Sequence, residues 1–504
     1  MTIFWGDSIL DEGPGLDILG LRGLDQAIEA SLVNGITTIS IRARYFTILP
    51  WAIGTFTEID TSNGAVLFDI DRLNRFMRRV QFLILAATIR DSHASSTRGA
   101  LGSDLWDDEM AALKAGRNVP FPTKGSEAFL GTYFGPARAL GLIADAPPGS
   151  PAPYKMTSRG TEIFELRGQL LNGSPIVEVL KHGEVLDPQI VDLAVPEFSL
   201  GAMSAFGDEA AMLCRALFEP WKSEVLRTTE RVAVAYRQFA GSIAWLNAAL
   251  DENPGSATSV LNRNLSKRCG IGDTNEIADR WAEYEWRRRC HYALELMLSA
   301  VTKTLIVFGD NNLPSLISRW REQSSDQTAI VSAWSVPADL WQRSAKDACN
   351  SIPEQLFLGE SLPTQKINAL SAGEQALMAF GLIAALEKQT RRLRERVSTR
   401  RGPGECAIAM VVAADHTPFQ EFLELLVAET VVSPHLLTTL QKMANDLKCS
   451  LRFFSDGPVL RATGIMSQPG FSNDRLGNVM RILADIGELA EKAGGYAPKD
   501  GSRS

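Results

Sequence analysis

The residues best suited to contact a nucleic acid lie between positions 125 and 166. Tyr133 and Arg138 fall in one helical pattern. Lys155 and Arg159 follow a turn rich in proline and glycine. Basic side chains neutralise phosphates, and a tyrosine hydroxyl can hydrogen-bond to a base edge. These four side chains therefore predict contact with double-stranded DNA.

The elements that would position these side chains are a helix, a hairpin and a second helix. Residues 131–140 are expected to form the first helix, and the hairpin turns at 146–151. Thr157 or Ser158 would cap the second helix through its hydroxyl. This order is typical of a winged helix, in which one helix enters the major groove of DNA.

The charge of this stretch does not decide between DNA and a protein as the partner. Residues 70–170 carry a small excess of basic over acidic side chains, and the turn at 146–151 has no lysine or arginine. A weakly basic surface permits phosphate contact but does not require it. Docking of a partner protein on the winged helix is therefore the alternative.

Two further basic clusters are candidates for nucleic-acid contact. Residues 391–401 place several arginines at the end of a predicted helix, where cations also interact favourably with the helix dipole. Residues 286–289 place three arginines within a helix, where Glu283 and Glu285 could pair with them. A structural role is the alternative to nucleic-acid contact in both clusters.

Metal-assisted or acid–base chemistry has little support in the sequence. His291 and Glu295 lie one helical turn apart, but one helix offers only two ligands, and a His–Glu hydrogen bond is the alternative. Asp104 and Asp108 could hold Mg²⁺ in a nuclease, although acidic residues are common in a first helical turn. Nucleotide-binding, zinc-protease and serine-hydrolase motifs are missing from the sequence. We therefore predict no metal, no cofactor, no assigned catalytic residue and no enzymatic activity.

Composition indicates an ordinary globular protein of a reducing compartment. The chain has 504 residues, of which 45% are hydrophobic and 22% charged, and its net charge is −8. This acidic balance excludes a protein whose whole surface is covered by nucleic acid. The six cysteines show no paired spacing, and the sequence shows neither a long apolar run nor a secretory signal. We expect a cytoplasmic protein without membrane contact.

Hydrophobic periodicity predicts a mainly α, multi-domain helical protein. We expect an N-terminal mixed segment over 1–66, a winged-helix-containing domain over 67–175, a central helical domain over 176–366 and a C-terminal helical domain over 367–504. The last domain should carry a β-hairpin around the Asp-Gly turn at 455–458 between two helices, which is a second helix–hairpin–helix pattern.

Local patterns give more specific expectations. Residues 71–91 carry one apolar stripe and predict a helix. Residues 36–46 favour a helix over a strand, with Pro50 kinking or ending it. Residues 176–180 are the most strand-like run of their region, and 473–492 are expected to form the final helix.

Several short motifs together resemble a group of uncharacterised bacterial proteins often found among mobile-element and antiviral defence genes. The first motif is Asn34-Gly-Ile-Thr-Thr-Ile-Ser-Ile-Arg-Ala-Arg-Tyr-Phe46, followed by Trp51, and the group tends to have proline where this chain has Asn34. The others are Arg78-Arg79, Tyr133 with the Leu140-Gly-Leu142 run, and a pattern of Trp, Tyr, Glu and Arg over 281–288. The resemblance implies a setting, the bacterial cytoplasm and phage defence, but no mechanism.

Within the first motif the resemblance singles out Arg42, Arg44 and Tyr45. The functional interpretation of these residues is contact with an anion or a nucleic acid. The alternative is that the arginines pair with acidic residues and hold the N-terminal part of the fold together.

The sequence as a whole favours a non-enzymatic DNA-binding or recognition subunit of a bacterial, antiviral complex, which acts through the winged helix together with other protein subunits. A protein–protein interaction scaffold without DNA contact is the first alternative. A metal-dependent nuclease with dispersed carboxylates is the second.

Overall fold

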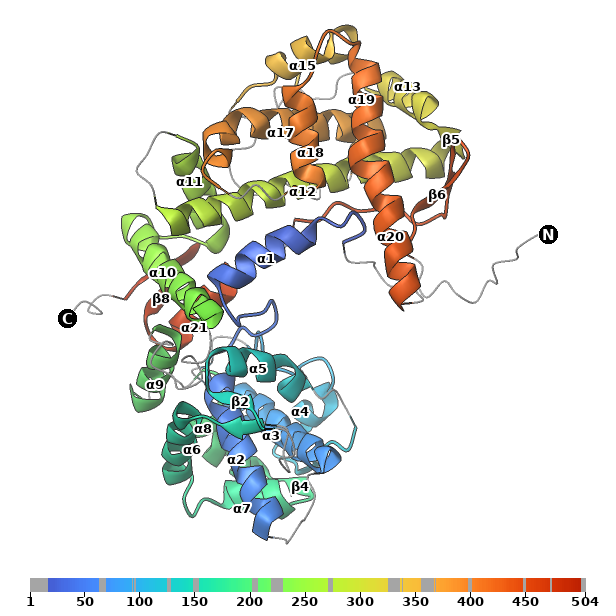
Figure 1. The fold of residues 1–504 in the computed structure, drawn as a ribbon. Coiled ribbons are helices and arrows are strands. Elements are labelled where there is room, and N and C mark those ends of the chain that lie inside the picture. Colours follow the sequence, from blue (N-terminus) through green and yellow to red (C-terminus); the bar gives the residue numbers. More distant parts are fainter. Residues whose placement is uncertain are drawn as a thin grey trace. The chain divides into compact units, whose positions relative to one another are not determined.

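A computed structural model gives the fold of the chain (Figure 1). The described part is mainly helical, as the sequence predicts, and contains short sheets of two or three strands. The structure describes residues 17–499 apart from 63–68, 93, 95–96, 125–127, 148–153, 202–206, 219–229, 271–274, 325–335, 338, 355–366, 368, 398–400, 447–449 and 472–473.

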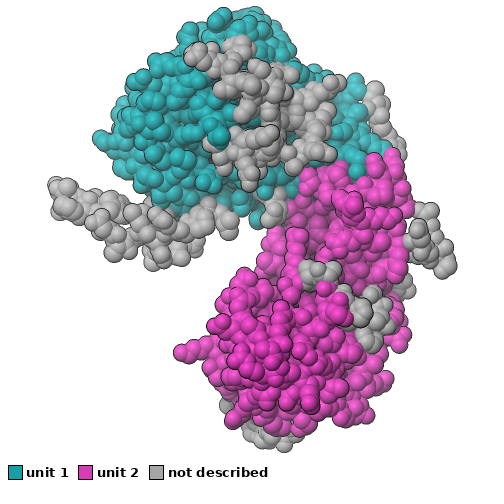
Figure 2. All heavy atoms as spheres, turned by 180° about the vertical axis from the view of Figure 1, so that it is seen from behind, with its two compact units in different colours: residues 1–28, 261–472 teal, residues 29–260, 473–504 magenta. Residues whose placement is uncertain are grey.

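The chain divides into two compact units, which Figure 2 colours separately. Unit 1 combines residues 1–28 with 261–472, and unit 2 combines 29–260 with 473–504. These bounds differ from the four predicted segments, because each unit joins stretches that lie far apart in the sequence. The predicted central domain, 176–366, is divided between the two units. Hydrophobic periodicity identifies helices but does not show which distant helices pack together.

Two helices cross the boundary between the units, and the remaining elements belong to one unit each. The boundary helices are α1 (Arg22–Leu32) and α11 (Ala257–Cys269). Unit 2 contains α2 (Tyr45–Ser62), α3 (Ile70–Arg90), α4 (Asp107–Lys114), β1 (Val119–Pro120), α5 (Ala128–Ala139), β2 (Ile143–Asp145), β3 (Tyr154–Met156), α6 (Ser158–Leu170), α7 (Pro175–His182), β4 (Val185–Leu186), α8 (Pro188–Phe198), α9 (Gly207–Phe218), α10 (Glu230–Glu252), α21 (Leu476–Asp485), β8 (Leu489–Lys492) and β9 (Gly495–Pro498). Unit 1 contains α12 (Glu276–Phe308), β5 (Asn311–Asn312), α13 (Leu313–Gln323), the short helix η5 (Leu340–Gln342), α15 (Ala345–Ser351), α17 (Ala372–Arg394), α18 (Pro403–Val412), α19 (Phe419–Val427), the π-turn η6 (Ala428–Val432), α20 (Ser433–Asp446), β6 (Phe453–Asp456) and β7 (Val459–Ala462).

Helix α3 confirms the helix predicted over 71–91. Asp69 caps its start, and its side chain accepts hydrogen bonds from the backbone N–H groups of Asp71 and Arg72 at 2.9 and 3.1 Å. These bonds satisfy two donors that the start of a helix leaves unpaired. The apolar stripe of α3 is buried in the core of unit 2.

The predicted order of helix, hairpin and helix is present as α5, β2, β3 and α6. Strands β2 and β3 pair antiparallel, and the hairpin tip at 148–153 lies outside the described residues. Thr157 caps α6, because its hydroxyl accepts a hydrogen bond from the backbone N–H of Gly160 at 3.1 Å. A Cβ at Gly160 would lie 2.1 Å from the Leu142 carbonyl oxygen, so the hairpin and α6 are in close backbone contact.

The helix predicted over 36–46 is wrong, because residues 36–44 are irregular and α2 begins only at Tyr45. The Thr37 backbone N–H donates to the Ser40 hydroxyl at 2.8 Å, and the Ser40 N–H donates to the Thr37 hydroxyl at 3.1 Å. Such local side-chain bonds compete with helical hydrogen bonding. Helix α2 then continues through Pro50.

The strand predicted over 176–180 is also wrong, because this run lies in α7. Ser174 caps that helix through its side chain, which accepts from the backbone N–H of Ile176. Pro175 occupies the first helical position, where its fixed backbone angle and missing N–H favour a helix start. These two start signals outweigh the β-branched composition of the run.

The final helix is shorter than the 473–492 predicted. Helix α21 ends at Asp485, and Gly487 then adopts a φ of +83°, a conformation that favours glycine. Strands β8 and β9 follow as an antiparallel hairpin. Gly255 and Tyr496 donate backbone hydrogen bonds to each other, both 3.0 Å long, which ties this hairpin to the turn that follows α10 in unit 2.

Helices α12 and α17 lie side by side and form the core of unit 1 (Figure 1). Both are buried around most of their circumference, as expected for helices at the centre of a large core. Helix α17 starts with a capping box, in which Ser371 and Glu374 each accept a hydrogen bond from the other's backbone, at 3.2 and 2.8 Å.

The hairpin predicted around 455–458 is confirmed as β6 and β7. Gly457 at its turn has a φ of +60°. Strand β5 also pairs with β7, so the sheet has the order β5–β7–β6. Helix α20 precedes this hairpin in unit 1, whereas α21 belongs to unit 2. The two helices that flank the hairpin in sequence therefore belong to different units.

Two helical stretches, Glu276–Phe308 and Phe419–Ala444, are long and apolar enough to cross a membrane by length and composition. A core helix of a soluble protein meets the same criterion, and 78% of the apolar window of the first stretch is buried inside the protein. This burial agrees with the place of α12 in the core of unit 1.

Candidate functional site

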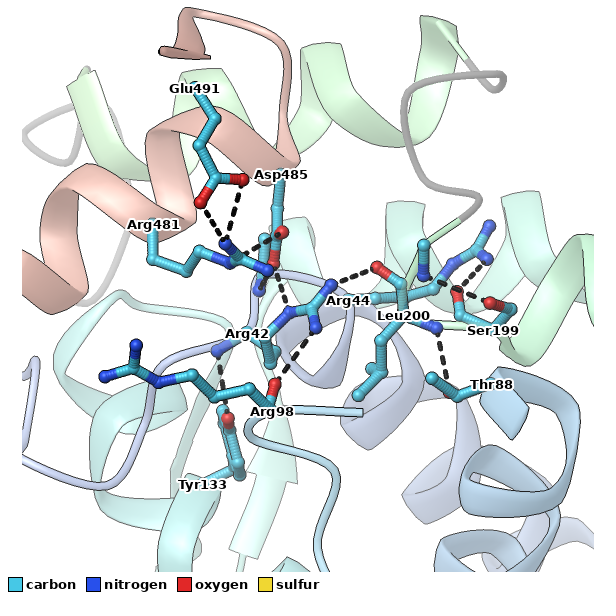
Figure 3. Close-up of polar contacts among 12 residues, drawn as sticks. Arg42, Arg44, Thr88, Arg98, Tyr133, Ser199, Leu200, Arg481, Asp485 and Glu491 are labelled. Atoms are coloured by element: carbon cyan, nitrogen blue, oxygen red, sulfur yellow. Dashed lines mark hydrogen bonds and ion pairs between the residues drawn. The ribbon is translucent and has the colours of Figure 1, made fainter. Parts of the chain in front are cut away.

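Tyr133 lies in the core of unit 2 and not on its surface. Its ring is fully buried and packs against Tyr45 and Phe46, at 4.5 and 5.2 Å between ring centroids. Its hydroxyl accepts a hydrogen bond from the backbone N–H of Arg42 at 3.2 Å (Figure 3). The prediction that Tyr133 contacts DNA is therefore wrong, because the apolar face of α5 turns this residue inward.

Arg138 is exposed, as predicted, but it is engaged in an ion pair. Its Nη1 lies 2.9 Å from a carboxylate oxygen of Asp145 on β2, and the two side chains are 51% and 67% exposed. Such a surface pair contributes little to stability. It does, however, place a carboxylate beside the one exposed cation of α5.

Lys155 and Arg159 lie on the second half of the module. Lys155 is exposed on β3, opposite Ala144 of β2. Arg159 is half-buried in the first turn of α6. Of the four predicted DNA contacts, Arg138 and Lys155 are thus the two that the structure exposes.

The exposed side of α5 is poor in side-chain atoms. Its most exposed residues are Gly131, Gly135 and Arg138, with Leu130 and Phe134 half-buried beside them. A Cβ added at either glycine would meet nothing within 4 Å. These five residues, Leu130, Gly131, Phe134, Gly135 and Arg138, form the α5 face, a smooth and mostly apolar surface.

The surroundings of α5 depart from a winged helix in two respects. Strand β1 pairs with β4 and does not extend the β2–β3 hairpin. The chain between α4 and α5 runs from Lys114 to Ala128, far longer than the roughly three- or four-residue turn of a helix-turn-helix.

Arg42 is buried and connects three segments of unit 2 (Figure 3). Its Nε lies 2.9 Å from a carboxylate oxygen of Asp485 on α21. Its two terminal nitrogens donate to the backbone carbonyls of Arg98 and Leu200. The guanidinium is therefore occupied by partners within the fold.

Arg44 is fully buried and shares a carboxylate with a second arginine. Glu209 of α9 accepts from Arg44 at 3.0 Å and from Arg167 of α6 at 2.8 Å. Burial alone would raise the pKa of Glu209, but the charges of Arg167 and Arg44 outweigh it and hold the pKa below its ordinary value. Arg44 also donates to the Ser199 carbonyl at 2.6 Å.

Tyr45 is likewise fully buried, and its hydroxyl accepts from the backbone N–H of Leu101 at 2.9 Å. Burial raises the pKa of this hydroxyl well above its ordinary value. The prediction that Arg42, Arg44 and Tyr45 contact an anion or nucleic acid is wrong. The ion pairs expected in the alternative are present, because both arginines bind acidic residues of the same unit.

In unit 1 the three arginines at 287–289 are buried, and each pairs with a carboxylate of α12. Arg287 binds Glu283, while Arg288 and Arg289 both bind Glu285, at distances of 2.7 to 3.0 Å. The structural alternative for this cluster is therefore confirmed. Sequence spacing indicated these pairs because residues three or four apart share one helix face.

His291 lies between two carboxylates in the interior of unit 1. Its Nδ1 is 3.0 Å from Asp25 of α1, and its Nε2 is 3.1 Å from Glu295 of α12. Burial alone would lower the pKa of His291, but the hydrogen bonds to Asp25 and Glu295 outweigh it and raise the pKa to about 9. The predicted His–Glu hydrogen bond is confirmed, and Asp25 is a partner that the sequence did not reveal.

Among the described residues, no group of three or more His, Cys, Asp and Glu side chains is arranged to hold a metal ion. Asp104 and Asp108 are exposed, and Asp108 lies in the acidic first turn of α4. This placement agrees with the ordinary helix-start role that was the alternative to a nuclease site.

Searches for related proteins add no assignment. No family model, curated protein or solved structure matches this chain. The resemblance to bacterial defence-associated proteins therefore stays a prediction.

Proposed function

We propose that this chain is a non-enzymatic scaffold subunit that binds a partner protein on the α5 face of unit 2. The proposal keeps the bacterial, antiviral setting that the sequence motifs imply. It rests on the residues exposed on the surface of unit 2, because the buried arginines described above already bind carboxylates inside the protein.

The observation that carries the proposal is the composition of the α5 face. A helix that reads DNA needs side chains long enough to reach base edges. Gly131 and Gly135 have none, and the one long polar side chain, Arg138, binds Asp145. A smooth apolar surface instead allows a partner helix to pack closely, since the distance between packed helices, about 8–10 Å, depends on the side chains at the contact.

The cost of Gly131 to helix stability also supports a partner protein on the α5 face. Glycine within a helix costs about 1 kcal/mol relative to alanine. No described residue lies where a Cβ at Gly131 would be, so packing within unit 2 does not require glycine there. Gly135 differs, because it precedes Pro136, whose ring would crowd a Cβ on the preceding residue. Close approach of a partner gives a reason for Gly131.

The cation at one end of the α5 face, Arg138, indicates the charge of the partner. Arg138 binds Asp145 of β2, and both side chains are exposed. A partner that places a carboxylate at this end would compete with Asp145 for Arg138. We therefore expect an apolar contact with an acidic edge.

The substitution Gly131→Arg tests this proposal, because the new side chain would extend into open space and leave the fold intact. Gly168→Arg is the matched control, since a Cβ at this helical position of α6 also meets nothing within 4 Å. The protein would be expressed with its neighbouring genes and purified at roughly 1 M salt, which screens exposed charges.

We expect the wild type and Gly168→Arg to retain the same partner protein, and Gly131→Arg to retain at least about tenfold less, a loss of roughly 1.4 kcal/mol. Equal retention by all three would contradict the proposal.

DNA binding through a winged helix is the second candidate. The exposed Lys155 and half-buried Arg159, which follow the hairpin tip, favour it. Anisotropy of a labelled duplex of about 30 base pairs at roughly 50 and 200 mM salt tests it. Tight binding that falls steeply with salt, and that the Arg138→Ala/Lys155→Ala double variant weakens, would favour DNA over a protein partner. A weak anisotropy change that does not depend on salt would favour a protein partner over DNA.

A further inference from the structure

Unit 1 contains a cleft whose lining residues differ from the candidate site residues described above. It has a volume of about 510 Å³ and is lined by α15, the second half of α17 and the end of α18. Two lysines and two arginines line it, namely Lys346, Lys388, Arg391 and Arg394. The volume falls within the range of roughly 300–1,000 Å³ that is usual for small-molecule sites.

The two arginines are held in place by one buried carboxylate. Arg391 binds Glu387 through its Nε and Nη2, at 3.1 and 3.0 Å, and Arg394 reaches the same carboxylate at 3.4 Å. Glu387 is 6% exposed, whereas Arg391 is 65% exposed. A guanidinium carries five donors, of which this contact uses two. Arg391 is thus fixed on the protein side and still has donors for a ligand.

The two lysines come from different walls of the cleft, Lys388 from α17 beside the arginines and Lys346 from α15. Lys388 donates from Nζ to the carbonyls of Asn350 and Ile352, at the end of α15, at 3.0 and 2.7 Å. An ammonium has three donors, so one remains for a ligand. Lys346 is exposed in the first turn of α15. Because carboxylates are fewer than cations in the lining, the cleft has a net positive charge.

An apolar wall lies beside these cations. It is made by Val411, Val412 and Ala414 at the end of α18. Val412 is 63% exposed, so its methyl groups face water. Covering exposed apolar surface is favourable by about 25 cal/mol per Å². A flat apolar ring on this wall would gain from that burial, while an anionic group reaches the cations.

We propose that this cleft binds a nucleoside phosphate, with the phosphate on Arg391 and the two lysines and the base against Val412. Guanidinium and ammonium groups are the usual phosphate partners, and a base supplies the flat apolar surface that the valine wall can cover. The ligand is either a free nucleotide or the 5′-phosphorylated end of a nucleic acid. The proposal concerns unit 1 alone and does not depend on the partner of unit 2.

Binding of a fluorescent ADP derivative to the full chain tests the proposal, with unlabelled ADP and inorganic phosphate as competitors. Arg391→Gln removes a lining cation. Arg392→Gln is the matched control, because this arginine is exposed on the same helix but does not line the cleft. Arg391→Lys keeps the positive charge at this position and removes the forked donors of the guanidinium.

We expect Arg391→Gln and Lys346→Gln each to weaken ADP binding at least about tenfold, as the loss of a charge-assisted hydrogen bond implies. Arg392→Gln should stay within about twofold, and Arg391→Lys should recover part of the affinity. Stronger competition by a 5′-phosphorylated oligonucleotide than by ADP would identify a nucleic-acid end as the source. No ADP binding at millimolar concentration, or equal effects of Arg391→Gln and Arg392→Gln, would overturn the proposal.

Discussion

The buried arginines of unit 2 and those of α12 in unit 1 are neutralised by carboxylates that lie at different distances along the chain. In unit 2, Arg42 binds Asp485, 443 positions away in the chain, and Arg44 binds Glu209, 165 positions away. In α12, Arg287 and its neighbours bind carboxylates three or four positions away on the same helix. Both sets neutralise charge in the interior. The carboxylates of the first set all lie on distant segments, whereas each arginine of the second set has a carboxylate on its own helix, and Arg287 also binds Glu405 of α18.

This difference determines what each network can contribute. A pair within one helix forms whenever that helix forms, and so it adds to local order. A pair between distant segments forms only in the complete fold. Removing one partner of such a buried pair leaves an uncompensated charge, which costs about 3–5 kcal/mol. We therefore expect substitutions to have larger effects in the long-range network of unit 2.

The largest effect is expected for Glu209→Ala, which removes the shared partner of Arg44 and Arg167. The free energy of unfolding of unit 2 should fall by about 3–5 kcal/mol. Hydrogen exchange of α2 and α9 under increasing denaturant measures it. Glu162→Ala, at an exposed pair with Arg215, is the control and should have little effect. A loss below about 1 kcal/mol for Glu209→Ala would remove the basis of the comparison.

His291 combines both kinds of pairing, since Glu295 is local and Asp25 is distant. Arg22 of α1 also faces Glu295, at 3.5 Å. Because folding raises the pKa of His291 from 6.5 to about 9, the stabilisation is complete below pH 6.5 and is lost as the pH rises through 9. The loss should be on the order of 3 kcal/mol.

Thermal unfolding of unit 1 between pH 6 and pH 10, in the wild type and in His291→Gln, measures this dependence. The wild type should lose stability more steeply than the variant across this window. Parallel profiles for the two proteins would show that His291 is not charged in the folded state.

A smaller effect is expected within α12. Glu283→Ala removes one partner of Arg287, but Glu405 of α18 stays within 3.0 Å of that arginine. The guanidinium therefore keeps a carboxylate, and the cost should be about 1 kcal/mol. Chemical denaturation with hydrogen exchange of α12 as the probe checks this value. A cost equal to that of Glu209→Ala would mean that the remaining contact with Glu405 does not compensate the charge of Arg287.

The smallest effect is expected for Asp145→Asn, at the exposed pair with Arg138. Surface pairs contribute at most about 1 kcal/mol, and the change in unfolding free energy should be below roughly 0.5 kcal/mol. The substitution also tests function, because it removes the ion-pair partner of Arg138 on the α5 face. Stronger retention of an acidic partner protein, with unchanged stability, would sharpen the contrast between structural and surface charges.

Sequence patterns predicted the elements and contacts formed by residues close together in the chain, and missed the contacts between distant residues. The helical class, α3 and the β6–β7 hairpin followed from periodicity and turn residues. So did the pairing of the arginines in α12, because spacing along one helix fixes which side chains meet. Ser174 with Pro175, and Gly487, carried the start and stop signals that were overlooked at α7 and α21.

The candidate site could be predicted only in part. Arg138 and Lys155 are exposed as expected, but no local pattern in the sequence indicates that Tyr133 turns inward. Nor could it show that Asp485 and Glu209 meet Arg42 and Arg44, because those contacts depend on how distant helices pack. The motif around Arg42 supplies buried residues whose partners lie within unit 2.

The most direct test of a partner protein on the α5 face is photo-cross-linking from that face in living cells. A photoreactive phenylalanine analogue would replace Gly131 in one version of the protein and Gly168 in the other, since both positions have open space around a Cβ. The account predicts a specific protein adduct from position 131 and none from position 168. An adduct to DNA from position 131, or the same protein adducts from both positions, would contradict it.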